Sequence, residues 1–187
     1  MKDRILQHIE TSRLKLVPIT EDHIGDIYAN FTEDISTYMY PSVPDDISET
    51  KLFVESEIDK NKRGIDLQMV AKDHTGEFLG CVALHKIDTK APEFGLWFKQ
   101  ASHGNGYGKE AIAALKTWAE NNLEYDYLVY PVDKRNIASR RVAESIGGVA
   151  TVEYDTKTPR GYILNTIDYR IYPSGSAPIH TSALNSK

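Results

Sequence analysis

Three alternating glycines stand where an apolar, aromatic segment gives way to a helical pattern. Gly104, Gly106 and Gly108 directly precede the amphipathic stretch 110–123. Glycines let backbone N–H groups converge without side chains in the way, and a helix N-terminus adds free N–H groups and a positive dipole end. The pattern therefore predicts a backbone site for an anion such as phosphate. A helix that simply follows a tight turn is the plainer alternative, which three glycines make less attractive than one.

The spacing of the loop disagrees with two common nucleotide-binding motifs. A P-loop has four residues between its glycines and continues with Lys and then Ser or Thr. Here three residues separate Gly104 from Gly108, and Lys109 is followed by Glu110. The dinucleotide fingerprint G-x-G-x-x-G needs its third glycine one residue later than Gly108. Binding of ATP or NAD through this loop is therefore the less favoured alternative.

Hydropathy patterns around the loop predict the elements that position it. A period of two predicts strands at 13–19, 65–72, 77–87, 92–99, 127–132, 149–154 and 161–172. Helical spacing and capping residues predict helices from 21 to about 31, from 48 to 63, over 110–123 and over 136–146, and a proline-broken loop at 38–44. The order βααβββαβαββ predicts an α/β (α+β mixed) fold with one mixed sheet covered by helices.

Length and charge limit the class of protein. The 187 residues predict a single domain over 1–172 and a small, polar tail over 173–187, which we expect to be flexible. Lysine and arginine number 22 against 27 aspartates and glutamates, so the formal net charge is −5. This balance argues against broad nucleic-acid binding, which needs a basic face.

Cysteine usage and hydropathy set further limits. Cys81 is the only cysteine, which rules out internal disulfides and cysteine zinc clusters. The histidines show no HxxxH or HxH spacing, so we predict no metal site. The start of the chain is charged and carries no apolar signal segment, and no apolar run approaches the roughly 20 residues that span a bilayer. These features predict a cytoplasmic protein without a membrane partner.

The loop and its surroundings resemble the GNAT (Gcn5-related N-acetyltransferase) superfamily, in particular its RimJ/RimL-type branch. The segment His103–Gly108 matches the pyrophosphate motif Q/R-x-x-G-x-G/A except at its first position, where His103 replaces Arg or Gln. Glu10–Leu16 resembles the opening strand T-x-R-L-x-L, and Gly95–Phe98 resembles the strand G-Y-W-L. Asn136–Gly147 resembles N-x-x-S-x-x-V-x-E-x-x-G. The resemblance covers about residues 10–172 in the expected order.

The resemblance implies the GNAT fold and acetyl-CoA as co-substrate. The fold is a twisted mixed sheet of about seven strands flanked by about four helices, with a wedge between the strands at 92–99 and 127–132. Pantetheine is expected along the backbone at Leu96, Trp97 and Phe98. The pyrophosphate is expected at His103, Gly104, Asn105, Gly106, Tyr107, Gly108 and Lys109. Asn136 is expected to contact the cofactor, to cap its helix, or both.

The implied reaction is direct attack of an amine on the thioester. An amine must lose a proton first, and Glu93, at the start of the cofactor strand, is the candidate base, with a solvated strand-end glutamate as the alternative. A backbone N–H near Leu96 or Trp97 is expected to bind the oxyanion. Ser139 is the candidate donor of a proton to the thiolate, unless it is an ordinary packing residue.

The identity of the acceptor amine does not follow from the sequence. A protein N-terminus, such as that of a ribosomal protein, and a small-molecule amine both stay open as partners, as does a homodimer. Tyr38 and Tyr40 line either an acceptor pocket or a packed loop. A GNAT-like module that binds acyl-CoA without catalysis is the alternative to an acetyltransferase. Cys81, in the middle of a predicted strand, is expected to be a small buried hydrophobic residue.

Overall fold

A computed structural model of the chain describes residues 7–175, whose strands form one mixed sheet. The strands lie in the order β1-β2-β3-β4-β5-β6-β8-β7. Their bounds are β1 (Ile9–Glu10), β2 (Leu14–Pro18), β3 (Leu67–Asp73), β4 (Phe78–His85), β5 (Glu93–Phe98), β6 (Leu128–Asp133), β7 (Val149–Lys157) and β8 (Ile163–Ile171). The predicted mixed sheet is confirmed, with eight strands instead of about seven. The additional strand, β1, has two residues and is too short to carry a period of two.

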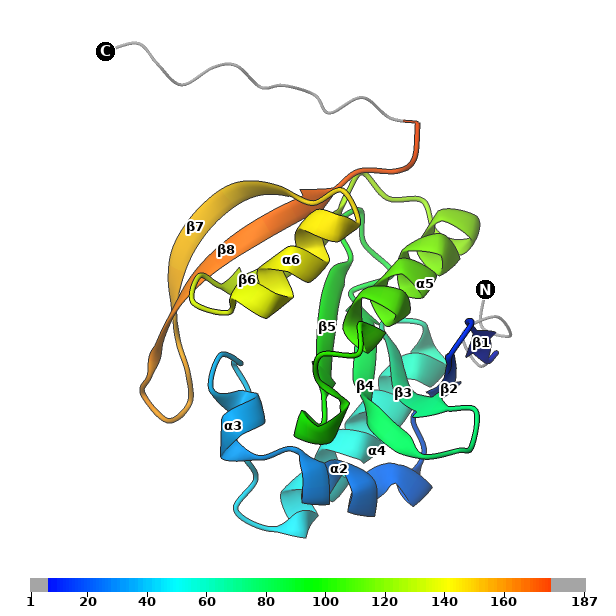
Figure 1. Ribbon diagram of the computed structural model, residues 1–187, viewed down its shortest axis with the longest axis vertical. Helices are drawn as coiled ribbons and strands as arrows, with labels where there is room; N and C mark the ends of the chain where they lie inside the picture. Colours follow the sequence, from blue (N-terminus) through cyan, green and yellow to red (C-terminus); the bar gives the residue numbers. More distant parts are fainter. Residues whose placement is uncertain (1–6, 176–187) are drawn as a thin grey trace.

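Helices cover both faces of this sheet (Figure 1). The helices are η1 (Glu21–His23), α2 (Ile24–Asn30), α3 (Glu33–Ser36), α4 (Ile47–Arg63), η2 (Gln100–Ser102), α5 (Tyr107–Asn122) and α6 (Ile137–Ser145). Figure 1 shows α5 and α6 in front of the sheet and α2 and α4 behind it. Within residues 7–175, no helix combines the length and the apolar character needed to cross a membrane.

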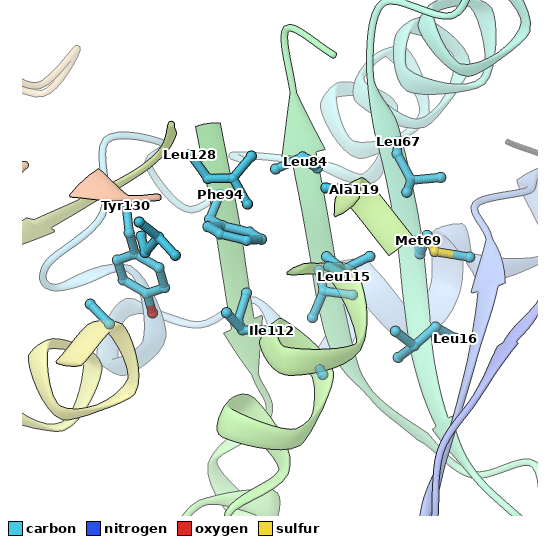
Figure 2. Close-up of a cluster of buried hydrophobic side chains, with 14 of the residues drawn as sticks. Leu16, Leu67, Met69, Leu84, Phe94, Ile112, Leu115, Ala119, Leu128 and Tyr130 are labelled. Atoms are coloured by element: carbon cyan, nitrogen blue, oxygen red, sulfur yellow. The ribbon is translucent and has the colours of Figure 1, made fainter. Parts of the chain in front are cut away.

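The larger part of the core lies between α5 and the sheet. Ile112, Leu115 and Ala119 occupy one stripe of α5 and are fully buried. Figure 2 shows them facing side chains from several strands, among them Leu84 and Phe94. The stripe follows the spacing i, i+3, i+7, which places its members on one helix face. Packing therefore fixes where the N-terminus of α5 stands relative to β5.

The sheet opens between β5 and β6. These strands are parallel, and their ladder contains the single residue pair Glu93 with Val129. Beyond that pair β6 continues with β8, in an antiparallel ladder from Leu128 to Asp133. The edge of β5 after Glu93 is thus unpaired on the side that faces β6. Unpaired strand edges present N–H and C=O groups that accept a further extended chain.

The boundaries of three helices differ from the sequence expectation. Helix α5 begins at Tyr107 and not at 110, because Gly106 adopts a left-handed conformation (φ 77°) and serves as its N-cap. Helix α4 begins at Ile47, where the side chain of Asp46 accepts a hydrogen bond from Ser48 N. Helix α3 was not expected; its single turn is too short to show a hydrophobic period.

The start of the expected tail is attached to α5. Ser174 donates hydrogen bonds to Glu120 Oε1 through its backbone N–H (3.0 Å) and its hydroxyl (2.7 Å). Lys116 Nζ donates to the Ser174 hydroxyl at 3.1 Å. The rest of the expected tail, from 176 to 187, lies outside the described residues, so its flexibility stays a prediction.

Candidate active site

The glycine loop presents an open backbone in front of α5. Gly104 and Gly106 both have positive φ angles, 78° and 77°. A Cβ atom at Gly104 would meet nothing within 4 Å, and one at Gly106 would meet only Arg13 Nη2, at 3.6 Å. Gly108 differs, because its Cβ would lie 3.3 Å from Leu96 Cδ1. The first two glycines therefore leave the backbone of the loop open, and the third lets α5 approach β5.

A carboxylate in the first turn of α5 ties this loop to the start of the chain. Glu110 accepts hydrogen bonds from Thr11 Oγ1 (2.6 Å), Ser12 Oγ (3.0 Å) and Arg13 N (2.9 Å). The guanidinium of Arg13 binds the second oxygen of Glu110 and also donates to Asn105 O at 2.8 Å. Burial opposes ionisation of Glu110, but these donors outweigh it and lower its pKa to about 2. We call Thr11, Ser12, Arg13 and Glu110 the loop brace.

Other side chains of the loop point back to the protein. His103 Nε2 donates to Phe98 O at 2.8 Å, so the ring is bound to the end of β5. Asn105 Nδ2 donates to the carbonyl oxygens of Ser102 and His103, both at 3.2 Å. The ring of Tyr107 stacks on Phe98 with centroids 6.4 Å apart. Lys109 is exposed. Side chains therefore support the loop, and backbone N–H groups are what it offers to an anion.

The side chains of the expected cofactor strand pack into the core. Phe94, Leu96 and Phe98 belong to the core cluster that packs with α5. Trp97 packs on the opposite face, with ring centroids 5.2 Å from Phe31 and 5.8 Å from Phe78. This alternation is that of a strand. Only the backbone of β5 is left to contact an extended ligand in the gap beside β6.

Asn136 and Ser139 lie together at the start of α6. Asn136 is the N-cap, and its Oδ1 accepts from Ser139 N at 3.1 Å. The hydroxyl of Ser139 lies 2.9 Å from Tyr130 Oη on β6. Burial raises the pKa of Tyr130 to about 12, although the Ser139 contact opposes that rise. Tyr130 therefore keeps its proton at neutral pH and can donate it to Ser139 Oγ. Sequence reasoning missed Tyr130, because a tyrosine in a buried strand is usually only a core residue.

Glu93 stands at the first position of β5, where the sheet begins to open. Lys86 Nζ donates to its Oε2 at 2.8 Å. Asp168 on β8 is electrostatically coupled to both Glu93 and Lys86, and accepts from Tyr154 Oη at 3.0 Å. Burial raises the pKa of Asp168, the bond from Tyr154 opposes the rise, and the charge of Glu93 adds to it. This end of the gap therefore holds two carboxylates, Glu93 and Asp168, with Lys86 and Arg170 as cationic neighbours. Sequence reasoning missed Asp168.

An aspartate and a histidine lie next to Glu93. Asp66, just before β3, is 4% exposed, and its Oδ2 lies 3.0 Å from His85 Nδ1. Its other oxygen accepts from Lys86 N at 2.8 Å. His85 is the last residue of β4 and pairs with Glu93 across the antiparallel ladder. A Cβ at Gly95 would lie 2.9 Å from His85 Nε2, so only glycine leaves room for this ring.

Glu57, Asp66 and His85 are close enough together to hold a metal ion, with their donor atoms within 4.8 Å of one another. The ammonium of Lys60, however, lies 2.6 Å from Glu57 Oε1 and 3.6 Å from Asp66 Oδ2. A cationic group therefore already offsets part of the charge of these two buried carboxylates. We interpret the group as an ion network among the described residues and assign no metal to it.

Two arginines connect the C-terminal half to the segment that contains Tyr38 and Tyr40. Arg160, in the β7–β8 turn, donates to Glu33 Oε1 at 2.7 Å and to Val43 O at 2.8 Å. Arg135 lies over the ring of Tyr38 at 5.4 Å. Tyr40 is exposed. The segment thus closes against the β7–β8 turn and the end of β6, and a role of the two tyrosines in acceptor binding stays a prediction.

Comparison with known proteins agrees with this geometry. The sequence profile of the family described as "Acetyltransferase (GNAT) domain" matches residues 13–149. The uncharacterized protein YkkB of Bacillus subtilis (strain 168) is 28% identical over 141 residues, which cover 73% of this chain and 82% of YkkB.

Two solved structures illustrate the shared fold. RimL, a ribosomal L7/L12 alpha-N-protein acetyltransferase in complex with coenzyme A, superposes with a TM-score of 0.78 at 18% identity, covering 91% of this chain and 100% of RimL. Spermidine N-acetyltransferase from Vibrio cholerae, in complex with CoA and spermine, gives a TM-score of 0.76 at 17% identity, covering 88% and 98%. Because the family profile matches most of residues 7–175, these findings lead to one conclusion: the protein belongs to the GNAT acetyltransferase family.

Proposed function

We propose that this protein transfers the acetyl group of acetyl-CoA to a primary amine by direct attack. Membership of the GNAT family makes it an acetyltransferase with acetyl-CoA as its donor. One observation carries the proposal for this chain: the unpaired edge of β5 leads directly into the open glycine loop at the start of α5. That continuity suits a ligand with an extended amide chain at one end and a pyrophosphate at the other.

The donor fits the chain through backbone groups. The amides of pantetheine would pair with β5 as an added strand does, which needs no side chain. The pyrophosphate would lie on the N–H groups of residues 104–109, where the α5 dipole favours negative charge. The loop brace keeps those groups in place, since Arg13 holds Asn105 O. A net charge of −5 is compatible with this site because the positive field is local.

Four groups around the gap suit the chemistry of acyl transfer. The ammonium nitrogen of the acceptor loses two protons in all: one leaves to solvent through a base, and the other ends on the CoA sulfur. Its lone pair attacks the thioester carbon, and the C–S bond breaks. Glu93 is positioned to attract the ammonium or take its proton. Ser139, bonded to Tyr130, is positioned to protonate the thiolate, and a backbone N–H near Leu96 serves the oxyanion.

The acidic end of the gap supports a cationic acceptor. Glu93 and Asp168 lie at the side away from the glycine loop, and burial together with the charge of Glu93 raises the pKa of Asp168. An ammonium placed between them would relieve this repulsion. Both a protein N-terminus and a small polyamine carry such a group, as the acceptors named for RimL and for the spermidine enzyme do.

A thiol-release assay tests the proposed function. Purified protein with acetyl-CoA is offered N-terminal peptides, polyamines and single amino acids, and free CoA thiol is measured against time. We expect turnover with at least one cationic amine and none with an N-acetylated control. Calorimetric binding of acetyl-CoA without turnover across the panel would instead indicate a non-catalytic module. Binding of ATP or NAD with none of CoA would refute the assignment of the loop.

A further inference from the structure

We propose that His85, oriented by Asp66, is the base that takes the proton of the acceptor amine, with Glu93 binding the ammonium. This inference rests on the proposed acetyl transfer and names a catalytic residue that the sequence motifs did not indicate. Three observations carry it: the place of His85 beside the gap, its fixed orientation, and the engagement of Glu93 by Lys86.

The first observation is position. His85 and Glu93 are direct partners in the β4–β5 ladder, so their side chains emerge from the same face of the sheet. The ring of His85 lies over Gly95, where a Cβ would be only 2.9 Å from Nε2. Gly95 is next to Leu96, the residue whose N–H we assign to the oxyanion. The ring is therefore one residue along β5 from the expected thioester.

The second observation is orientation. Asp66 is buried and accepts from Lys86 N, which fixes its carboxylate. Burial disfavours its ionised form, yet the bonds from His85 and Lys86 and the charge of Lys60 lower its pKa. An ionised Asp66 accepts the Nδ1 proton of His85. The neutral ring then carries its lone pair on Nε2, the atom over Gly95.

The third observation concerns the competing base. Lys86 Nζ donates to Glu93 Oε2 at 2.8 Å, so this carboxylate oxygen is already engaged. Imidazole is the side-chain group that enzymes most often use as a general base. The charged groups around His85 are Asp66, the Glu57 and Lys60 pair of α4, and Glu93 with Lys86. Glu93 is thus suited to bind the ammonium and His85 to deprotonate it.

The step balances without a further reactant. An ammonium R–NH3+ bound at Glu93 gives one proton to His85 Nε2, directly or through one water, which leaves R–NH2 and an imidazolium. The amine attacks the thioester carbon, the C–S bond breaks, and the remaining surplus proton reaches the sulfur by way of Ser139. The imidazolium returns its proton to solvent.

The test removes the imidazole ring of His85 by mutation and supplies free imidazole in solution. His85→Ala is assayed by thiol release, with the best amine of the panel, from pH 5.5 to 9, with and without added imidazole. We expect kcat/KM to fall by about 10²-fold or more, the ascending limb of the pH profile to disappear, and added imidazole to restore part of the rate. Acetyl-CoA affinity should stay unchanged. His8→Gln, at an exposed histidine, is the matched control.

Several outcomes separate this inference from the proposed function. A wild-type rate with His85→Ala, or an unchanged pH profile, would overturn the assignment of His85 and leave acetyl transfer standing. Loss of rate without rescue by imidazole, in a variant that still binds acetyl-CoA, would also count against it. If imidazole restored the rate of Ser139→Ala, this would overturn the assignment of His85 as the base and Ser139 as the proton donor to the thiolate. A wild type inactive with every amine would refute both proposals.

Discussion

Replacing Glu110 with Gln removes the charged centre of the loop brace. Glutamine keeps the size of the side chain, but it turns an NH2 group toward donors from Thr11, Ser12 and Arg13. One or more of these donors then loses its charged acceptor, and the part-buried hydroxyl of Thr11 has the least access to water as a replacement. We therefore expect Glu110→Gln to destabilise the protein and to loosen the glycine loop.

The magnitude follows from the pKa of Glu110. The folded protein lowers it from 4.5 to about 2, and a tenfold change in a protonation equilibrium is worth about 1.4 kcal/mol. The ionised form of Glu110 thus contributes up to about 3 kcal/mol to the free energy of unfolding at pH 7. Because the folded pKa is depressed, this contribution is complete above about pH 4.5 and is lost as the pH falls toward 2. At pH 3 about 1.4 kcal/mol remains.

Urea unfolding of wild type and Glu110→Gln at pH 7 and pH 3 measures both values. The difference between the two proteins should shrink by about 2 kcal/mol at pH 3. Calorimetry at pH 7 should also show that the variant binds acetyl-CoA about tenfold more weakly, or about 1.4 kcal/mol, because Arg13 no longer holds Asn105 O firmly. Glu124→Gln, at an almost fully exposed glutamate, should change neither quantity. A stability difference independent of pH would refute the reasoning.

Three further predictions concern the gap, the loop and the core. Tyr130→Phe removes the hydrogen bond to Ser139 Oγ, so kcat should fall with little change in KM; steady-state kinetics in which the variant keeps the wild-type kcat and only KM rises would argue against this. Gly106→Ala and Gly76→Ala both place Ala at a positive φ and should each cost about 1 kcal/mol by urea unfolding, but only Gly106→Ala should weaken acetyl-CoA binding in calorimetry. Ile112→Ala empties a fully buried position and should cost about 3 kcal/mol by urea unfolding; a cost under 1 kcal/mol would contradict the assigned core.

Local pattern was sufficient for most elements and for the loop. The turn at Gly76, the end of α4 at Gly64 and the N-cap at Asn136 all follow from residues that act within a few positions. The three glycines predicted an anion site for the same reason, since their effect on backbone conformation is local. The short elements β1 and α3 were not predicted, because a stretch of two to four residues is too short to show a hydrophobic period.

The side chains around the gap were harder to predict because distant segments bring them together. Asp66 and His85 are 19 residues apart and meet only when β3 and β4 pair beside α4. Glu110 and Arg13 are 97 residues apart. Arg13 lies in the predicted opening strand and Glu110 follows the glycine loop, so local patterns do not connect them. Their contact depends on the packing of α5 across β2. Asp168 and Tyr130 looked like ordinary strand residues.

By itself, the sequence determined the order of the elements and the glycine loop before a long helix, and it predicted an anion as the ligand of that loop. These depend on backbone conformation and on short-range hydrophobic period. Only the tertiary structure decided that β5 separates from β6 after one pair, that Ser139 meets Tyr130, and that His85 lies over Gly95. The physical reason is that sheet register and helix packing set these distances, and both arise from the burial of the whole core.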